Sequence, residues 1–284
     1  MKEYHNLLRS NQYVAHKYQK KGNIVIADTN RGKVVIKRKA DNMDIINYLQ
    51  SRQVDICPLL VGTNDKYNIY SYVEDVDTPK EQKINDLVVS VAQLHKKTSY
   101  VKNVDETYYK KIYEDLNNNI IYLTEYYNDL ISMIDELEYY SPDEYLVARN
   151  YSIISNTLLN IKNELDNWFN NIKNTNKVRT SVIHNNLSID HFRQDKHNYL
   201  VSWDKAKLDM PIFDLYKLVN NQDCDLEEVL KIYNSIYSLT DDELKLLNIL
   251  VYMPKLIDMN NTSYKNCLLI KNEIKKMIKK NKNS

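Results

Sequence analysis

The sequence contains few residues of the kinds that build disulfide frameworks, glycine-rich loops or membrane spans. Its 284 residues include only three cysteines, three glycines and five prolines. The cysteines, Cys57, Cys224 and Cys267, are odd in number and widely spaced, which argues against a disulfide framework or a zinc site. No apolar run approaches the roughly 20 residues that a bilayer-spanning helix needs, and the amino terminus lacks the apolar core of a signal peptide. We therefore expect a cytoplasmic protein without a membrane partner.

The chain also has almost no net charge. Lys and Arg number 39 against 38 Asp and Glu, which gives a formal charge of +1. That balance creates no general attraction to nucleic acid, so we expect no nucleic-acid partner. A basic stretch at residues 275–282 is expected to complement the negative end of a final helix. The length suits one compact unit of two lobes.

Helical periodicity dominates the chain after residue 78. Three capping boxes mark helix starts, at Thr78, Ser141 and Thr240. Apolar residues three and four apart predict two long amphipathic helices, over residues 112–137 and 154–172. Three shorter helices are expected near residues 226–238, 241–253 and 263–280. The helix after Thr78 contains His95, which we expect to be a packed structural residue.

The N-terminal third has a different pattern, rich in β-branched residues. Residues 24–27 and 33–38 flank a turn at residues 28–32 and predict a β-hairpin. A helix is expected over residues 42–52. A further strand is expected at residues 69–74, followed by the connection to the helical part.

The most informative segment runs from residue 181 to residue 218. It contains V-I-H-N-N-L-S-I-D-H-F from Val182, N-Y-L-V-S-W-D from Asn198 and D-M-P-I-F-D-L from Asp209. Two short strands, over residues 179–183 and 199–201, are expected to present Asn186 and Ser202 toward a cleft.

In order and spacing these motifs resemble the aminoglycoside-phosphotransferase and choline-kinase superfamily, most closely its CotS-like spore-coat branch. The family pattern reads H-G-D-x-x-x-x-N, then I-D-[FW]-[DE], then P-x-x-D-L. The resemblance implies an α+β, two-lobed protein-kinase-like fold. A small β-rich N-lobe would span residues 1–72, and a large, mainly helical C-lobe over residues 73–284 would carry the catalytic and metal loops. Residues 34–37 resemble the kinase V-A-I-K strand, which makes Lys37 a candidate phosphate contact.

Aligned with the family pattern, the chain keeps the structural residues and replaces the chemical ones. His184 takes the motif histidine, with a structural role. Asn186 falls at the catalytic aspartate, while His191 and Ser202 fall at the two metal-ligand positions. Asp214 falls at an aspartate that braces the catalytic loop, and we expect that role here. The other matching residues are Trp203, Asp204, Pro211 and Leu215.

These replacements remove groups on which phosphoryl transfer depends. Kinases use Mg²⁺ to bridge the phosphates and a carboxylate to accept the substrate's hydroxyl proton. The amide of Asn186 has no basicity for that step. Ser202 offers a neutral hydroxyl and His191 a nitrogen, whereas Mg²⁺ prefers carboxylate oxygens. Because losing one preorganised group commonly costs about 3–4 kcal/mol of transition-state stabilisation, we expect catalysis to be lost.

Two hypotheses about function follow. The first is a pseudokinase that binds or scaffolds, in the spore coat if the CotS-like resemblance carries over, with protein partners or a small-molecule ligand and no certain cofactor. The second is an active ATP-dependent phosphotransferase acting on a small-molecule hydroxyl, with ATP and Mg²⁺ as cofactors. It would use Asp190 and Asp204 as substitute metal ligands, although Asp at such positions commonly turns a loop or binds nearby backbone. A third alternative is an unrelated, mainly helical protein with chance similarity. The sequence gives no indication of the oligomeric state.

Overall fold

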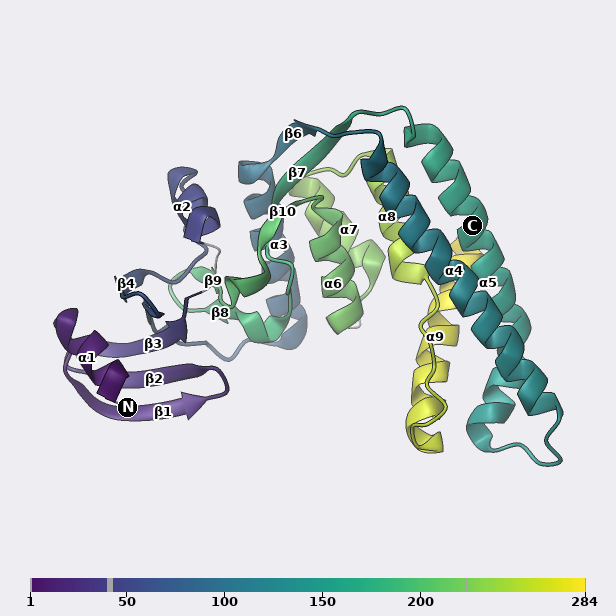
Figure 1. The fold of residues 1–284 in the computed structure, drawn as a ribbon, viewed down its shortest axis with the longest axis horizontal. Coiled ribbons are helices and arrows are strands. Elements are labelled where there is room, and N and C mark those ends of the chain that lie inside the picture. Colours follow the sequence, from purple (N-terminus) through teal and green to yellow (C-terminus); the bar gives the residue numbers. More distant parts are fainter. Residues whose placement is uncertain (1, 40–42, 223, 284) are drawn as a thin grey trace. The chain divides into compact units, whose positions relative to one another are not determined.

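The computed structural model describes residues 2–39, 43–222 and 224–283. The chain divides into two compact units, Met1–Val101 with Arg179–Ser238, and Lys102–Val178 with Leu239–Ser284. The first unit holds the N-terminal sheet and the whole motif segment, and the second is mainly helical (Figure 1). The lobe boundary near residue 72 stays a prediction, because this division does not test it.

The N-terminal sheet of the first unit is antiparallel throughout, with strand order β1-β2-β3-β5-β4. Its strands are β1 (Ala15–Lys21), β2 (Ile24–Thr29), β3 (Gly32–Arg38), β4 (Leu60–Thr63) and β5 (Tyr67–Ser71). Pairing of β2 with β3 confirms the predicted hairpin, and Gly32, with φ +99°, ends its turn. A non-glycine residue would be strained in that conformation.

The two faces of this sheet have different roles, because successive side chains of a strand point to opposite faces. Val34 and Ile36 of β3 are buried in a core with Leu7 and Leu8 of α1 (Lys2–Ser10). Val35 and Lys37, which alternate with them, line a cavity. One face therefore stabilises the sheet and the other is available for a site.

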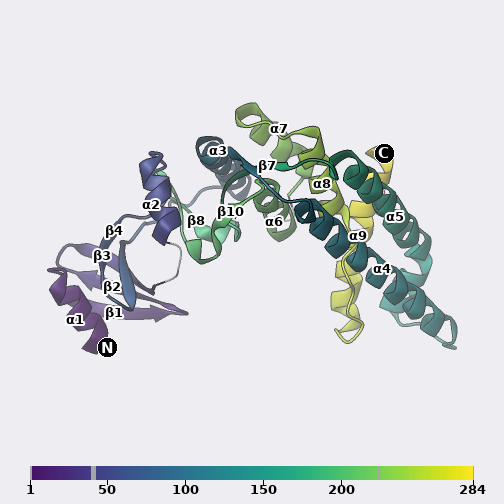
Figure 2. The same ribbon diagram turned by 45° about the horizontal axis from the view of Figure 1, so that its top comes forward.

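The rest of the first unit consists of helices and short strands around the motif segment (Figure 2). Its helices are α2 (Met43–Ser51), α3 (Lys80–Thr98), α6 (Ile212–Gln222) and α7 (Leu226–Ile236). Strands β8 (Phe192–Gln194) and β9 (Asn198–Leu200) form a hairpin. A second sheet has the order β10-β7-β6, from β6 (Tyr100–Asn103), β7 (Lys177–Ile183) and β10 (Lys207–Asp209), and the chain passes from one unit to the other within β6 and within β7. The strands predicted at residues 179–183 and 199–201 are thus confirmed within a residue or two. The helix predicted from residue 42 is present from Met43, and Asn42 itself lies outside the described residues.

One predicted capping box is wrong. The N-cap of α3 is Pro79, and the hydroxyl of Thr78 instead donates to the carbonyl of Val76 at 3.3 Å. The amide of Val76 is hydrogen-bonded to the carbonyl of Gln194 in β8 at 2.8 Å, so the hairpin helps to fix the segment just before the helix. The boxes at Ser141 and Thr240 are confirmed.

The second unit packs four helices around long apolar stripes. They are α4 (Thr107–Asp135), α5 (Pro142–Ile172), α8 (Asp241–Tyr252) and α9 (Ser263–Asn283), with α4 beside α5 in Figure 1. Leu123 and Tyr127 of α4 and Leu158 and Leu165 of α5 are buried, as the periodicity predicted. Among the described residues no helix is long and apolar enough to cross a membrane.

Candidate functional site

A cavity of about 170 Å³ lies in the first unit on the second face of the N-terminal sheet. Its apolar lining includes Ile24, Ile26, Val35, Ile46 and Tyr70. Its charged and polar lining comes from Lys21, Lys37, Arg38, Arg193, Ser202 and Asp204. The cavity therefore joins an apolar surface to a group of mainly cationic side chains.

Lys37 and Asp204 form an ion pair inside this cavity. Lys37 lies on β3, and Asp204 lies in the short 3₁₀ helix Trp203–Lys205, so the pair joins the N-terminal sheet to the motif segment. The Lys37 side chain is 22% exposed and that of Asp204 is 44% exposed, so the contact is partly screened by water. The predicted phosphate contact and one of the predicted substitute metal ligands are thus brought together, each neutralising the other.

Ser202 lines the same cavity and has a left-handed backbone, with φ 68° and ψ 50°. A residue other than glycine occupies this region rarely, and the conformation costs about 1–3 kcal/mol. Ser202 is one of the residues that line the cavity, whereas Asn186, which was predicted to face the same cleft, is not.

The loop that contains His184 and Asn186 is held by one buried carboxylate. Asp214 of α6 is fully buried and accepts hydrogen bonds from the backbone amides of His184 at 2.8 Å and Asn185 at 2.7 Å. His95 of α3 donates to the same carboxylate from Nε2 at 3.2 Å, and the Tyr233 hydroxyl lies 2.8 Å from His95 Nδ1. Asp214 has the contacts of a brace, and His95 is a packed structural residue.

His184 connects this loop to the segment that carries Ser202. Its Nε2 donates to the carbonyl of Val201 at 2.9 Å, and its ring packs edge-on against Trp203. Burial lowers the pKa of His184, and this outweighs the opposite effect of nearby Asp214. The neutral imidazole is therefore a structural link between the two loops.

The remaining predicted site residues do not reach the cavity. Asn186 accepts a hydrogen bond through its carbonyl from His191 Nδ1 at 2.8 Å, while its side-chain amide bonds to no residue in the described part of the chain. Asp190 is exposed in the 3₁₀ helix Ile189–His191. Asn186, Asp190 and His191 are absent from the cavity lining, so the structure gathers only Lys37, Ser202 and Asp204 there.

The residues at the expected metal positions fit Mg²⁺ poorly. Within residues 2–39, 43–222 and 224–283 no group of three or more His, Cys, Asp or Glu could hold a metal ion. Ser202 is uncharged, His191 is engaged through Nδ1 with Asn186, and Asp204 is paired with Lys37. A hard cation would have to displace the Lys37 ammonium to reach the carboxylate. The metal roles of Asp190, His191, Ser202 and Asp204 stay predictions.

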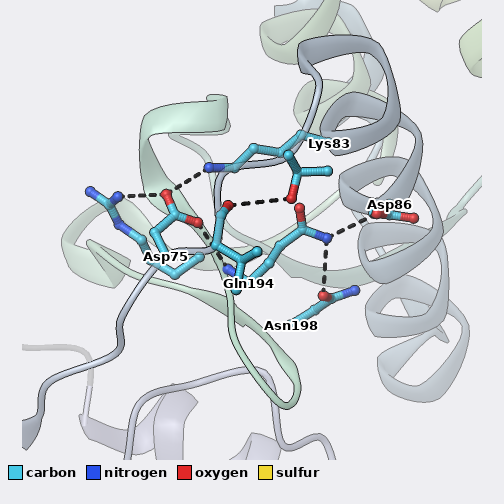
Figure 3. Close-up of polar contacts among 8 residues, drawn as sticks. Asp75, Lys83, Asp86, Gln194 and Asn198 are labelled. Atoms are coloured by element: carbon cyan, nitrogen blue, oxygen red, sulfur yellow. Dashed lines mark hydrogen bonds and ion pairs between the residues drawn. The ribbon is translucent and has the colours of Figure 1, made fainter.

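A polar network fixes the β8–β9 hairpin beside the cavity (Figure 3). Asp75 accepts hydrogen bonds from Lys83 Nζ and Arg193 Nη1, both at 2.7 Å, and from the Gln194 amide at 3.1 Å. Gln194 Nε2 in turn donates to Asp86 of α3 at 2.9 Å. Burial opposes ionisation of Asp75, but these donors outweigh it and lower the pKa of the carboxyl group.

The network and several cleft residues were missed by the sequence reasoning. Asp75, Arg193, Lys21 and Arg38 belong to none of the family motifs. Alternation along the strand indicates only that Val35 shares a face with Lys37, and it gives no signal for Arg38, which has the opposite parity. No comparable signal pairs Asp75 with Arg193, because 118 positions separate them.

Cys57 also lines the cavity, but its thiol is in its unreactive, protonated form. Burial raises the pKa of the Cys57 thiol to about 12. Because the thiolate is the reactive form, this cysteine contributes apolar surface rather than a nucleophile.

Comparison with known proteins identifies the fold. Neither the family models nor the curated proteins include a match to this sequence. Among solved structures, an aminoglycoside phosphotransferase from Alicyclobacillus acidocaldarius matches with a TM-score of 0.69 and 9% identity, over 93% of this chain and 89% of that chain. The choline kinase LicA from Streptococcus pneumoniae matches with a TM-score of 0.52 and 14% identity, over 98% and 96% of the two chains. LicA in complex with AMP matches with a TM-score of 0.51 and 15% identity, over 98% and 95%.

The chain has the kinase-like fold of aminoglycoside phosphotransferases and choline kinases. This confirms the predicted α+β class, with a β-sheet N-terminal region and a mainly helical C-terminal region. The third alternative, an unrelated helical protein, is therefore wrong. At such low identity the likeness shows the fold alone.

Replacing Asp214 tests the brace. In Asp214→Ala, the amides of His184 and Asn185 and the ring of His95 lose a buried acceptor, so we expect the free energy of unfolding to fall by about 3 kcal/mol or more. Urea unfolding followed by circular dichroism measures it. Asp190→Ala, a matched change at an exposed carboxylate in the same segment, should stay within about 0.5 kcal/mol. Similar losses in both variants would contradict the brace.

The lowered pKa of His184 predicts a pH dependence of stability. A histidine whose pKa is depressed in the folded state favours folding fully above its unfolded value, about 6.5, and less as the pH falls below it. We expect the free energy of unfolding to fall between pH 7.5 and pH 5.5, and to fall less steeply in His184→Asn. Equal slopes for the two proteins would show that other groups cause the dependence.

Proposed function

We propose that this chain is a kinase-fold protein that binds a phosphorylated, nucleotide-like ligand without a divalent metal and does not transfer its phosphate. The observation that carries the proposal is the Lys37–Asp204 ion pair in the cleft. The Asp204 carboxylate is thus paired with the ammonium group of a lysine side chain instead of a metal ion.

The charges around the cavity support an anionic ligand. Lys21, Lys37, Arg38 and Arg193 line it, whereas Asp204 is the one carboxylate among the described lining residues. Arg193 shares Asp75 with Lys83, and Lys37 is paired with Asp204. Lys21 and Arg38 have no ion-pair partner in the described part of the chain, so they supply uncompensated positive charge. Cationic side chains can neutralise phosphate oxygens directly, with guanidinium groups binding two at once.

The apolar part of the lining supports the other half of such a ligand. Ile24, Ile26, Val35 and Tyr70 offer a surface of the kind that holds a flat ring. The matching choline kinase is described in complex with AMP. A nucleobase packed against these side chains would place the attached phosphates near the cationic residues of the lining.

Loss of transfer is supported by the residues at the expected catalytic positions. Asn186 cannot accept a proton at neutral pH, and Ser202 supplies no charge for a metal. The competing hypothesis, an active phosphotransferase that uses Asp190 and Asp204, needs the two carboxylates near one metal. Asp190 is exposed and absent from the cavity lining, so no observation favours that hypothesis.

The biological setting rests on the sequence resemblance. The motifs from His184 to Leu215 resemble the CotS-like spore-coat branch, and we extend the proposal to a binding or scaffolding role in the spore coat, with protein partners there. A source organism that forms no spores would contradict this extension without affecting the ligand proposal.

Thermal unfolding with ATP tests the ligand class and the metal independence together. Ligand at a hundred times its dissociation constant stabilises a protein by about 2.7 kcal/mol, and we expect the same shift in EDTA as in Mg²⁺. Lys37→Met should reduce the shift. Lys33→Met is the matched control, because Lys33 lies on the same strand but outside the cavity, with Glu74 as its exposed partner. A shift that requires Mg²⁺ and is lost in Asp204→Ala would favour the active enzyme, and no shift in either buffer would contradict the ligand class.

Restoring one catalytic residue should not restore catalysis. In Asn186→Asp the base returns, but Ser202 still offers the metal no carboxylate, so we expect no turnover above the level of the unmodified chain. A coupled assay for ADP formation, with a panel of small alcohols and aminoglycosides, measures it. Robust phosphorylation of any acceptor by that single variant would contradict the argument.

A further inference from the structure

The second unit has a groove between α5 and α9 that nothing in the described chain covers. Its volume is about 330 Å³. The bottom is formed by Ile270 and Ile274 of α9 with Leu146 of α5, and Ile278, 40% exposed, lies at the far end. An apolar groove of this kind suits the apolar side chains of a partner.

The rim of the groove is cationic and unpaired. Arg149 of α5 and Lys271 and Lys275 of α9 line it, are exposed, and form no ion pair with any described residue. Neighbouring lysines of the same helix differ in this respect: Lys276 lies 3.5 Å from Glu273, and Lys280 lies 2.6 Å from Glu164. The rim therefore has positive charge that its own unit does not balance, which favours an acidic partner.

The same unit carries a complementary surface at the connection between α4 and α5. We call residues 135–140 the tip; all six are exposed. It presents three carboxylates, from Asp135, Glu136 and Glu138, none of which pairs with a described residue, and three apolar or aromatic side chains. Those are Leu137, 43% exposed, Tyr139, 82% exposed, and Tyr140, 44% exposed. Three acids interleaved with large apolar side chains match a groove with an apolar floor and three cations on its rim.

We propose that this groove binds the tip of a second copy of the chain. Leu137 and the two tyrosines would lie on the apolar floor, and the carboxylates would face Arg149, Lys271 and Lys275. Tyrosine and arginine are among the residues that most often dominate such contacts. In this structure the tip lies outside its own groove, because none of residues 135–140 is among the residues that line it.

The arrangement favours a reciprocal pair. Tip and groove lie on one unit, so two copies related by a two-fold axis can each place a tip in the other's groove, and the contact then occurs twice. Because both surfaces are charged and exposed, the association should weaken as salt is added. The proposal concerns the second unit alone and is independent of what the cleft binds.

A charge-reversal experiment tests it on the full chain. Sedimentation velocity of the unmodified protein should show a dimer whose population grows with concentration and falls between 50 mM and 500 mM salt. The groove variant Lys271→Glu/Lys275→Glu and the tip variant Glu136→Lys/Glu138→Lys should each associate at least tenfold more weakly, because like charges then oppose each other. All four positions are exposed, so the melting temperatures should change little.

The two variants in an equimolar mixture provide the decisive measurement. Acidic tips then meet unmodified grooves, and basic tips meet acidic grooves, so we expect the dimer to return. Lys265→Glu, an exposed change on α9 outside the groove, is the matched control and should associate like the unmodified chain. A monomer at every concentration, a dimer that neither reversal weakens, or a mixture that stays monomeric would each overturn the proposal.

Discussion

The carboxylate of Asp214 is the constraint on which the motif segment depends. It is fully buried and binds two consecutive backbone amides and the ring of His95, which brings α3, α6 and the loop at His184 to one point. His184 extends that connection to Val201 and so to the backbone of Ser202. A buried charge satisfied by several donors is costly to disturb, because each donor loses its partner with it. The shape of the segment can therefore persist when its reactive groups change.

In the cleft, one set of residues fixes the backbone, and a different set of side chains determines what the site can bind. Ser202, Asp204 and Lys37 line one cavity, where the Asp204 carboxylate is paired with the Lys37 ammonium. The positive charge around this cavity comes from the side chains of Lys21, Lys37, Arg38 and Arg193. Fold and reaction are distinct properties, and residues at the site decide the second.

Much of this architecture was predictable from the sequence, and the reasons are local. The hairpin at β2 and β3 was predicted from β-branched runs around a turn, the stripes of α4 and α5 from helical periodicity, and the short strands around Asn186 from apolar runs. Each of these patterns lies among residues close in sequence. The capping box predicted at Thr78 does not form, because the Thr78 hydroxyl bonds to Val76, whose amide is held by the distant β8–β9 hairpin. For the site, motif order indicated Lys37, Ser202 and Asp204. The pairing of Lys37 with Asp204 spans 167 positions, and the contacts of Asp75 likewise join distant segments, so only the folded chain shows them.

The left-handed backbone of Ser202 has a counterpart at Asn185, with φ 59°. The conformation is unfavourable for Ser202, whereas asparagine tolerates it better than most residues other than glycine. Asn185 is held by Lys217, whose ammonium donates to its carbonyl at 2.7 Å, and by its own side chain, which donates to the carbonyl of Lys205 at 3.0 Å. Contacts with neighbouring residues thus hold these backbone conformations in place. Their geometry lasts only as long as the surrounding helices remain folded, so the shape of the cleft at Ser202 depends on the folding of the unit as a whole.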